Sequence, residues 1–215
     1  MAGGELELHV TWQQHVGTGR PADGWYESVV TRHREAHRHY HDLRHVRWVV
    51  RHVREIVAGR SVGELDDVGA VVVAAFFHDI VYDPTASDNE AVSAALAGGA
   101  LRELQWAGER IDRVMAMIRG TAHHRVDDMM SIDTAVLYAA DLGVLAADPA
   151  GYAGYERNVR REYGHVTDVE WAHGRADVLR SFLDRPAIYA PILGLAGWEQ
   201  RARGNLTAEL GTLVR

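Results

Sequence analysis

The chain has 215 residues, of which 47% are hydrophobic and 25% are charged, and this suits one globular domain with a single core. A net charge of -7 argues against a protein that wraps nucleic acid or covers an anionic membrane through a broad basic field. The sequence contains no cysteine, which excludes disulfides, iron-sulfur clusters and thiol nucleophiles. All 23 basic residues are arginine, which also excludes lysine Schiff bases and the P-loop lysine. Any metal must therefore be held by His, Asp and Glu.

Hydrophobic periodicity near 3.6 residues dominates the chain, and no alternating stretch is bounded by hairpin dipeptides. We therefore expect an all-α helical bundle. Gly and Pro within 17–24 are expected to separate the first two helices, and Ser87 and Glu90 have the spacing of a capping box. The expected helices are 6–15, 25–34, 41–57, 65–82, 87–105, 109–119, 133–146, 150–163, 169–183 and 198–214.

The sequence predicts one domain over residues 1–215, with a short helical extension at about 1–24, because no linker and no internal repeat occurs. Its longest apolar run, 71–77, is far below the ~20 residues that a bilayer requires. The first 14 residues lack a basic segment followed by an apolar one. We expect a cytoplasmic protein with no membrane partner, and the apolar residues on its helix surfaces are compatible with a homodimer.

Two acidic residues stand in apolar surroundings. Asp79 follows His78 directly after the apolar run 71–77, and Asp141 is the only charge within 135–145. A buried carboxylate without a partner is costly, so a cation should meet each of them. Imidazoles and carboxylates ligate first-row transition ions, and the two acids therefore suggest a shared divalent metal. The alternative is a buried salt-bridge network in which the acids meet arginine.

Histidines are the second unusual feature, since seven of the thirteen lie within 33–78. His41 and His45 are four residues apart and share a helix face, so one is expected to ligate the metal and the other to face substrate. His123 and His124 at a helix end are candidates for a second metal or a phosphoryl oxygen, with His123 preferred. The remaining histidines of the early cluster are expected to be solvated: His33, His37, His39 and His52.

The order His45, His78-Asp79 and Asp141 gives the pattern H…HD…D, and the chain here resembles the HD superfamily of metal-dependent phosphohydrolases. More narrowly it resembles the branch with an HRxYHxLxH stretch, over roughly residues 25–210. That stretch reads His37-Arg38-His39-Tyr40-His41-Asp42-Leu43-Arg44-His45. Further matching stretches are 77–84, 88–90, 141–142, Glu199 and 202–206.

The resemblance implies an HD-like helical domain in which His45, His78, Asp79 and Asp141 hold a divalent ion, with Mn, Mg, Fe, Co, Ni and Zn all open and one or two ions per chain. Residues 40–45 are also similar to the YHNxxH stretch of cyclic-nucleotide phosphodiesterases, which implies that His41 is the general acid. Tyr82 stands where those enzymes have a further His and where nucleotidase-type HD enzymes have a Glu.

Together these features predict hydrolysis of a phosphate ester of a small metabolite, such as a nucleotide, by metal-activated water. His41 and Asp79 are the expected catalytic residues. The residues expected to contact substrate are Arg38, His123 and Tyr82, and no nucleic acid polymer is expected as a partner. Whether the substrate is a monoester or a diester stays open. The alternatives are a di-iron oxygenase on the same scaffold and a non-enzymatic helical module with a structural metal.

Overall fold

The computed structural model describes residues 3–61 and 63–213, and over these residues it is all helical, with ten α-helices, two short 3-10 helices and no strand. The all-α prediction is therefore confirmed. The α-helices are α1 (Gly3–His15), α2 (Arg20–Arg32), α3 (Leu43–Ala58), α4 (Val68–Phe77), α5 (Asn89–Glu103), α6 (Gly108–Gly120), α7 (Ile132–Asp141), α8 (Pro149–Glu162), α9 (Asp168–Leu183) and α10 (Ala196–Leu213). The 3-10 helices are η1 (Leu142–Ala146) and η2 (Pro191–Leu193).

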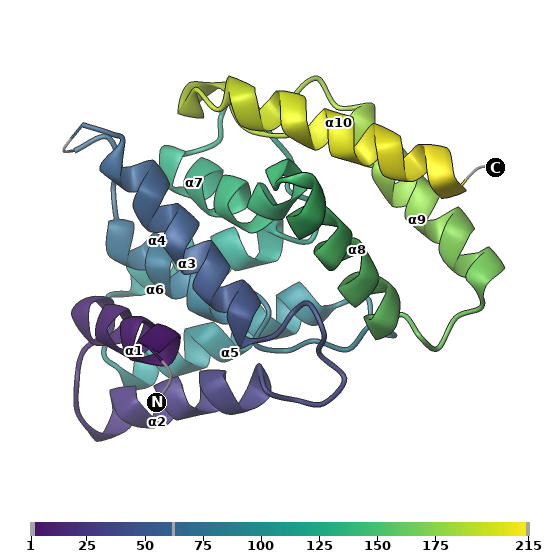
Figure 1. The fold of residues 1–215 in the computed structure, drawn as a ribbon. Coiled ribbons are helices and arrows are strands. Elements are labelled where there is room, and N and C mark those ends of the chain that lie inside the picture. Colours follow the sequence, from purple (N-terminus) through teal and green to yellow (C-terminus); the bar gives the residue numbers. More distant parts are fainter. Residues whose placement is uncertain (1–2, 62, 214–215) are drawn as a thin grey trace.

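The hydrophobic core is built around α4, whose residues from Ala70 to Phe77 are all fully buried. Helices α1, α3, α6 and α7 pack against it. Trp12 of α1 contacts the rings of Phe76 and Phe77 at centroid distances of 5.2 and 5.9 Å. The segment expected to be an N-terminal extension therefore contributes a fully buried side chain to the core. Helices α9 and α10 lie next to each other at the C-terminal end of the chain (Figure 1).

The break between the first two helices is shorter than the glycines and proline suggested. Helix α1 ends at His15 and α2 begins at Arg20, with Pro21 in its first turn. Proline is tolerated there because its missing N–H has no intrahelical partner in any case. The expected break over 17–24 is thus wrong from residue 20 onward, where α2 has already begun.

The predicted helix 65–82 ends earlier, at Phe77. Arg38 explains the end, since its guanidinium donates hydrogen bonds to the backbone carbonyls of Asp79 at 2.6 Å and Ile80 at 3.1 Å. The N–H of Val81 in turn donates to Ser93 Oγ at 3.1 Å. Side chains from elsewhere thus satisfy this backbone, and His78 and Asp79 lie in a turn beyond the helix.

The capping box expected at Ser87 and Glu90 is wrong as well. Asp88 is the N-cap of α5 and no side chain caps the helix there. Asn89 instead pairs with the backbone of Asp83, accepting its N–H at 3.0 Å and donating to its carbonyl at 2.8 Å. These bonds hold the connection between Asp83 and α5 in a fixed turn.

Two of the histidines expected at the surface are in the interior. His33 has no exposed surface and His52 only 6%. In both, Nδ1 lies within hydrogen-bonding distance of the carbonyl four residues earlier, at 2.8 and 2.9 Å. An N–H donated to that carbonyl satisfies one ring nitrogen, so a neutral imidazole can be buried in a helix. Arg38 and Arg175 are likewise buried, so arginine is not confined to the polar faces of the helices.

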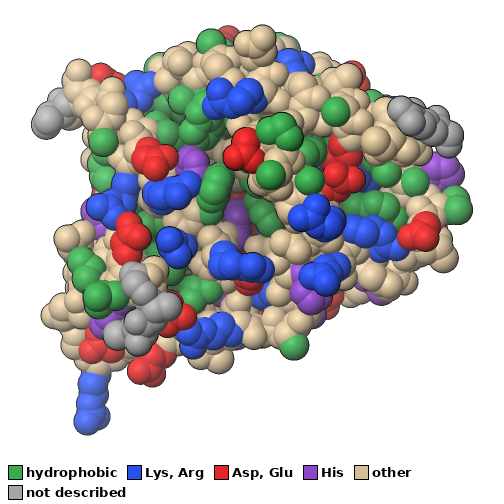
Figure 2. Space-filling view, in the orientation of Figure 1, with side chains coloured by type: hydrophobic (Ala, Val, Ile, Leu, Met, Phe, Trp, Pro, Cys, Tyr) green, Lys and Arg blue, Asp and Glu red, His purple; other side chains and the backbone are tan. Residues whose placement is uncertain are grey.

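Arginine and acidic side chains are interspersed over the face shown in Figure 2, rather than gathered into a field of one sign. Among the described residues, none of the helices combines the length and the apolar character that a membrane span requires.

Candidate metal centre

Three helices bring the predicted ligands together. His45 lies in the first turn of α3, His78 directly follows α4, and Asp141 is the last residue of α7. The Nε2 atoms of His45 and His78 are 3.0 Å apart, and they lie 3.1 and 3.4 Å from Asp141 Oδ1. These three residues form a group whose ligand atoms lie within 4.8 Å of one another and could hold a metal ion.

Asp79 completes a His/Asp cluster of four residues: His45, His78, Asp79 and Asp141. Its Oδ2 lies 3.1 Å from His78 Nε2 and 3.4 Å from His45 Nε2. All four predicted ligands are therefore within a few ångströms of one another. Among the described residues, no arginine forms an ion pair with either carboxylate, whose charged partners are imidazoles. This geometry does not support the alternative of an arginine-paired network.

The imidazoles and carboxylates of the cluster shift one another's pKa values toward the charged forms. Burial alone would raise the pKa of Asp79 and Asp141, but the adjacent imidazoles outweigh it and hold both values well below the usual range. Burial opposes the charge on His78 as well, yet the two carboxylates raise its pKa well above the usual value. Two Nε2 atoms at 3.0 Å need a proton or another cation between them.

The imidazole of His78 is oriented for coordination. Its Nδ1 lies 3.0 Å from the carbonyl oxygen of Ala75, and only an N–H can bond to that oxygen. The lone pair of a neutral His78 is then on Nε2, which faces the cluster. Metal-ligating histidines are commonly fixed by such a bond at the other nitrogen. Two imidazole nitrogens and two carboxylates match the ligand preferences of a first-row divalent ion, so the donor set fits the predicted metal.

Beyond the four predicted ligands, His124 also contacts the cluster. Its Nε2 lies 2.7 Å from Asp141 Oδ2, whereas His123, the residue preferred from sequence, is exposed. His124 lies just after α6 with a φ of 45°, in the left-handed region that non-glycine residues seldom adopt. A backbone conformation of this kind has no clear signal in the dipeptide His-His.

His41 is held by a carboxylate that the sequence did not reveal. Its Nδ1 lies 2.7 Å from Oε2 of Glu162 at the end of α8, and the same oxygen accepts the Tyr82 hydroxyl at 2.9 Å. The other oxygen, Oε1, accepts the backbone N–H groups of His39, Tyr40 and His41 at 2.7, 2.7 and 2.9 Å. Glu162 is thus fully hydrogen-bonded within the interior.

These contacts set the protonation of the pair. Burial raises the pKa of Glu162, but the bonds from His41 and the backbone outweigh it and lower the pKa to about 2. The ionised carboxylate requires an N–H at Nδ1 of His41, which leaves Nε2 as the nitrogen available to a ligand. The ring of Tyr82 stacks on that of His41 at a centroid distance of 4.2 Å.

A cavity of about 670 Å³ joins these groups, and we call it the cluster cavity. Its wall includes His41, Tyr82, Asp79, Asp141, His123 and His124. The predicted catalytic pair and two of the predicted substrate contacts therefore face one space. A volume of this size is typical of small-molecule sites.

Arg38 has a different position. Its side chain is buried, and its guanidinium donates to Glu35 and to the carbonyls of His41, Asp79 and Ile80. It joins the loop that carries His41 to the turn that carries Asp79. The substrate contact predicted for Arg38 stays a prediction, while the contacts in the structure give it a positioning role.

Comparisons with known proteins add no relative, since no protein family model, no curated protein and no solved structure matches this chain. The likeness to the HD superfamily therefore depends on the motifs of the sequence, and the site on its own geometry.

Proposed function

We propose that the protein is a metal-dependent phosphohydrolase that acts on a phosphate ester of a small metabolite, such as a nucleotide. The observation that carries this proposal is the meeting of two elements at one cavity: a His/Asp cluster suited to a divalent ion, and an imidazole oriented by a buried carboxylate. The sequence resemblance to HD phosphohydrolases points the same way.

In this proposal, His45, His78, Asp79 and Asp141 hold the metal. A divalent ion held by these residues would supply a Lewis acid for a phosphoryl oxygen and would lower the pKa of a bound water from 15.7 toward about 7. His41 holds a proton at Nε2 and gives it to the departing oxygen of the ester. Glu162 fixes the tautomer and orientation of His41 and stabilises its cationic form.

The first test is the metal content of protein purified without chelator, alongside the variants Asp79→Ala and Asp141→Ala. We expect about one divalent ion per chain in the parent and none in either variant. Full metal occupancy in the variants would show that the metal does not bind at the proposed site. Phosphate release from a panel of nucleotides and aryl phosphates then tests the reaction, and a metal-loaded protein inactive on all of them would favour a structural metal.

The second test concerns His41. The variant His41→Ala is expected to keep its metal and to lose roughly 10²- to 10⁴-fold in turnover, with the greatest loss on alkyl phosphates, whose leaving groups need the proton. His173→Ala is the matched control because His173 is an exposed histidine on α9. Equal losses on nitrophenyl and alkyl phosphates would contradict a general acid at His41.

A di-iron oxygenase is the second candidate, and the position of His124 against Asp141 Oδ2 is the observation that favours it. A carboxylate with imidazoles at both oxygens is suited to bridge two ions. Two irons per chain together with oxygen uptake would support this function in place of the first.

A further inference from the structure

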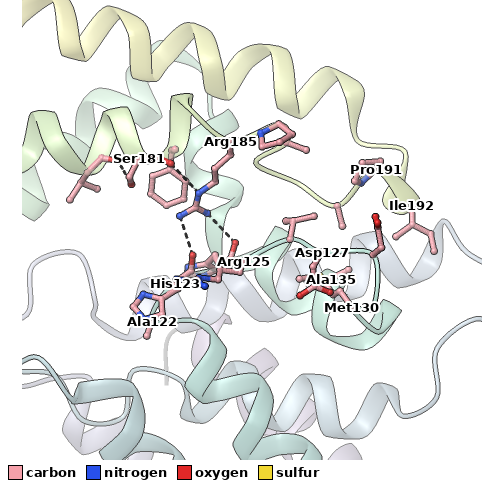
Figure 3. Close-up of a pocket in the computed structure, with 18 residues that line it drawn as sticks. Ala122, His123, Arg125, Asp127, Met130, Ala135, Ser181, Arg185, Pro191 and Ile192 are labelled. Atoms are coloured by element: carbon pink, nitrogen blue, oxygen red, sulfur yellow. Dashed lines mark hydrogen bonds between the residues drawn. The ribbon is translucent and has the colours of Figure 1, made fainter.

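A second and larger cavity adjoins the cluster cavity. It measures about 1180 Å³, and we call it the outer cavity. Residues that line both are Ala122, His123, His124, Val178 and Phe182. The outer cavity lies between the loop after α6 and the segment that follows α9 (Figure 3). A ligand that occupies the cluster cavity therefore has this space next to it.

Two arginines line the outer cavity, Arg125 and Arg185. Arg185 donates hydrogen bonds only to backbone carbonyls, those of His123 and His124 at 3.0 Å each and that of Ser181 at 3.2 Å (Figure 3). Among the described residues, neither arginine forms an ion pair with a carboxylate, although Asp127 and Asp128 line the same cavity.

Neither arginine is therefore in direct contact with a carboxylate of the described part of the chain. Burial lowers the pKa of Arg185, and the neighbouring charge of Arg125 lowers it further. Some arginines elsewhere in the described fold have a carboxylate partner, as Arg175 has Glu209 and Arg110 has Asp67. Two adjacent guanidinium groups beside a cavity are a strong recognition element for phosphate, which they can bind through several charge-assisted hydrogen bonds.

We infer that Arg125 and Arg185 bind a second phosphate group of the substrate, so that the substrate is a small molecule with two separate phosphates. One phosphate lies at the His/Asp cluster, and the other lies in the outer cavity. This inference rests on the proposed function and narrows its substrate class.

Arg125→Gln is the variant of choice, because Arg125 is exposed and its side chain makes none of the hydrogen bonds found among the described residues. Arg102→Gln is the matched control, since Arg102 is an exposed arginine on α5 that lines neither cavity. Both remove one positive charge from the surface. Arg185 is less suitable because it also holds the backbone of His124 in place.

The probes are adenosine 3′,5′-bisphosphate and adenosine 5′-monophosphate. We expect the parent to prefer the bisphosphate in kcat/KM, and Arg125→Gln to reduce that preference about ten-fold, the effect of one charge-assisted contact. Binding of the bisphosphate measured by calorimetry with a chelator present should weaken by a similar factor. Arg102→Gln should leave both quantities as in the parent.

The outcomes separate the two proposals. In one outcome, the parent and Arg125→Gln both hydrolyse the monophosphate, prefer the bisphosphate to the same extent and bind it with the same calorimetric affinity. That result would overturn the second phosphate site and leave the phosphohydrolase standing. No hydrolysis of either nucleotide, but an affinity for the bisphosphate that depends on Arg125, would support the anion site and count against the proposed reaction.

Discussion

Replacing Glu162 by Gln tests the contact between this buried carboxylate and His41, which the sequence motifs do not reveal. The amide keeps an oxygen that can accept the N–H groups of residues 39–41, but it places an NH₂ where Oε2 now faces His41 Nδ1 and the Tyr82 hydroxyl. The charge is lost, and an NH₂ group would meet the N–H of His41. The imidazole must then change tautomer or break the bond.

The size of the effect follows from the pKa of Glu162. Burial raises this pKa, but the bonds from His41 and the backbone outweigh burial and lower it from 4.5 to about 2. A carboxyl with a lowered pKa stabilises the folded state above the unfolded pKa, and that stability is lost as the pH falls. This difference corresponds to about 3 kcal/mol at neutral pH, of which about 2 kcal/mol is lost by pH 3.

Urea unfolding of parent and Glu162→Gln at pH 7 and at pH 3 measures both quantities. We expect the variant to be less stable by about 3 kcal/mol at pH 7 and the difference to shrink to about 1 kcal/mol at pH 3. The other buried carboxylates titrate in both proteins, so the comparison isolates Glu162. An equal stability at pH 7, or a difference that does not change with pH, would refute the assigned role of this carboxylate.

Three further predictions concern stability. Gly120→Ala should destabilise by about 1–3 kcal/mol, because an added Cβ would lie 1.5 Å from the Tyr138 hydroxyl, and adding Tyr138→Phe should restore part of the loss in thermal unfolding. Arg175→Met should lower the free energy of unfolding in urea by about 3–5 kcal/mol, since it leaves the buried Glu209 with the Tyr152 hydroxyl but without its cationic partner; an unchanged stability would contradict that dependence. Burial holds the pKa of His33 at about 3, so the unfolded chain binds a proton that the folded chain does not bind below pH 6.5. Between pH 7 and pH 5 the free energy of unfolding of the parent should therefore fall by about 2 kcal/mol more than that of His33→Gln.

The helices could be predicted because their apolar residues recur with the helical period, but several ends could not. Helix α4 is the clearest case. Apolar residues resume at Ile80 and Val81 after His78-Asp79, yet the helix ends at Phe77, where Arg38 takes the carbonyls of residues 79 and 80. That contact joins positions about forty residues apart, and no local pattern encodes it.

The acidic members of the His/Asp cluster could be predicted for a physical reason. A carboxylate in an apolar stretch needs a partner wherever the chain folds, so Asp79 and Asp141 carried their own signal. Glu162 carried none, because it stands in the polar stretch Arg160-Arg161-Glu162, where an exposed acid is the ordinary expectation. Its burial is decided by His41 and the backbone before α3, which reach it only in the folded chain.

The same carboxylate links the position of His41 to its chemistry. One oxygen of Glu162 binds three consecutive N–H groups at residues 39–41 and fixes the backbone that carries His41, while the other fixes the ring through Nδ1. Backbone and side chain are thus held by one group on α8, an element that contributes no metal ligand. A displacement of α8 would therefore have two effects at once: it would move His41 relative to His45, and it would change the tautomer of His41. The position of His41 therefore depends on the packing of α8, whereas the candidate metal site depends on α3, α4 and α7.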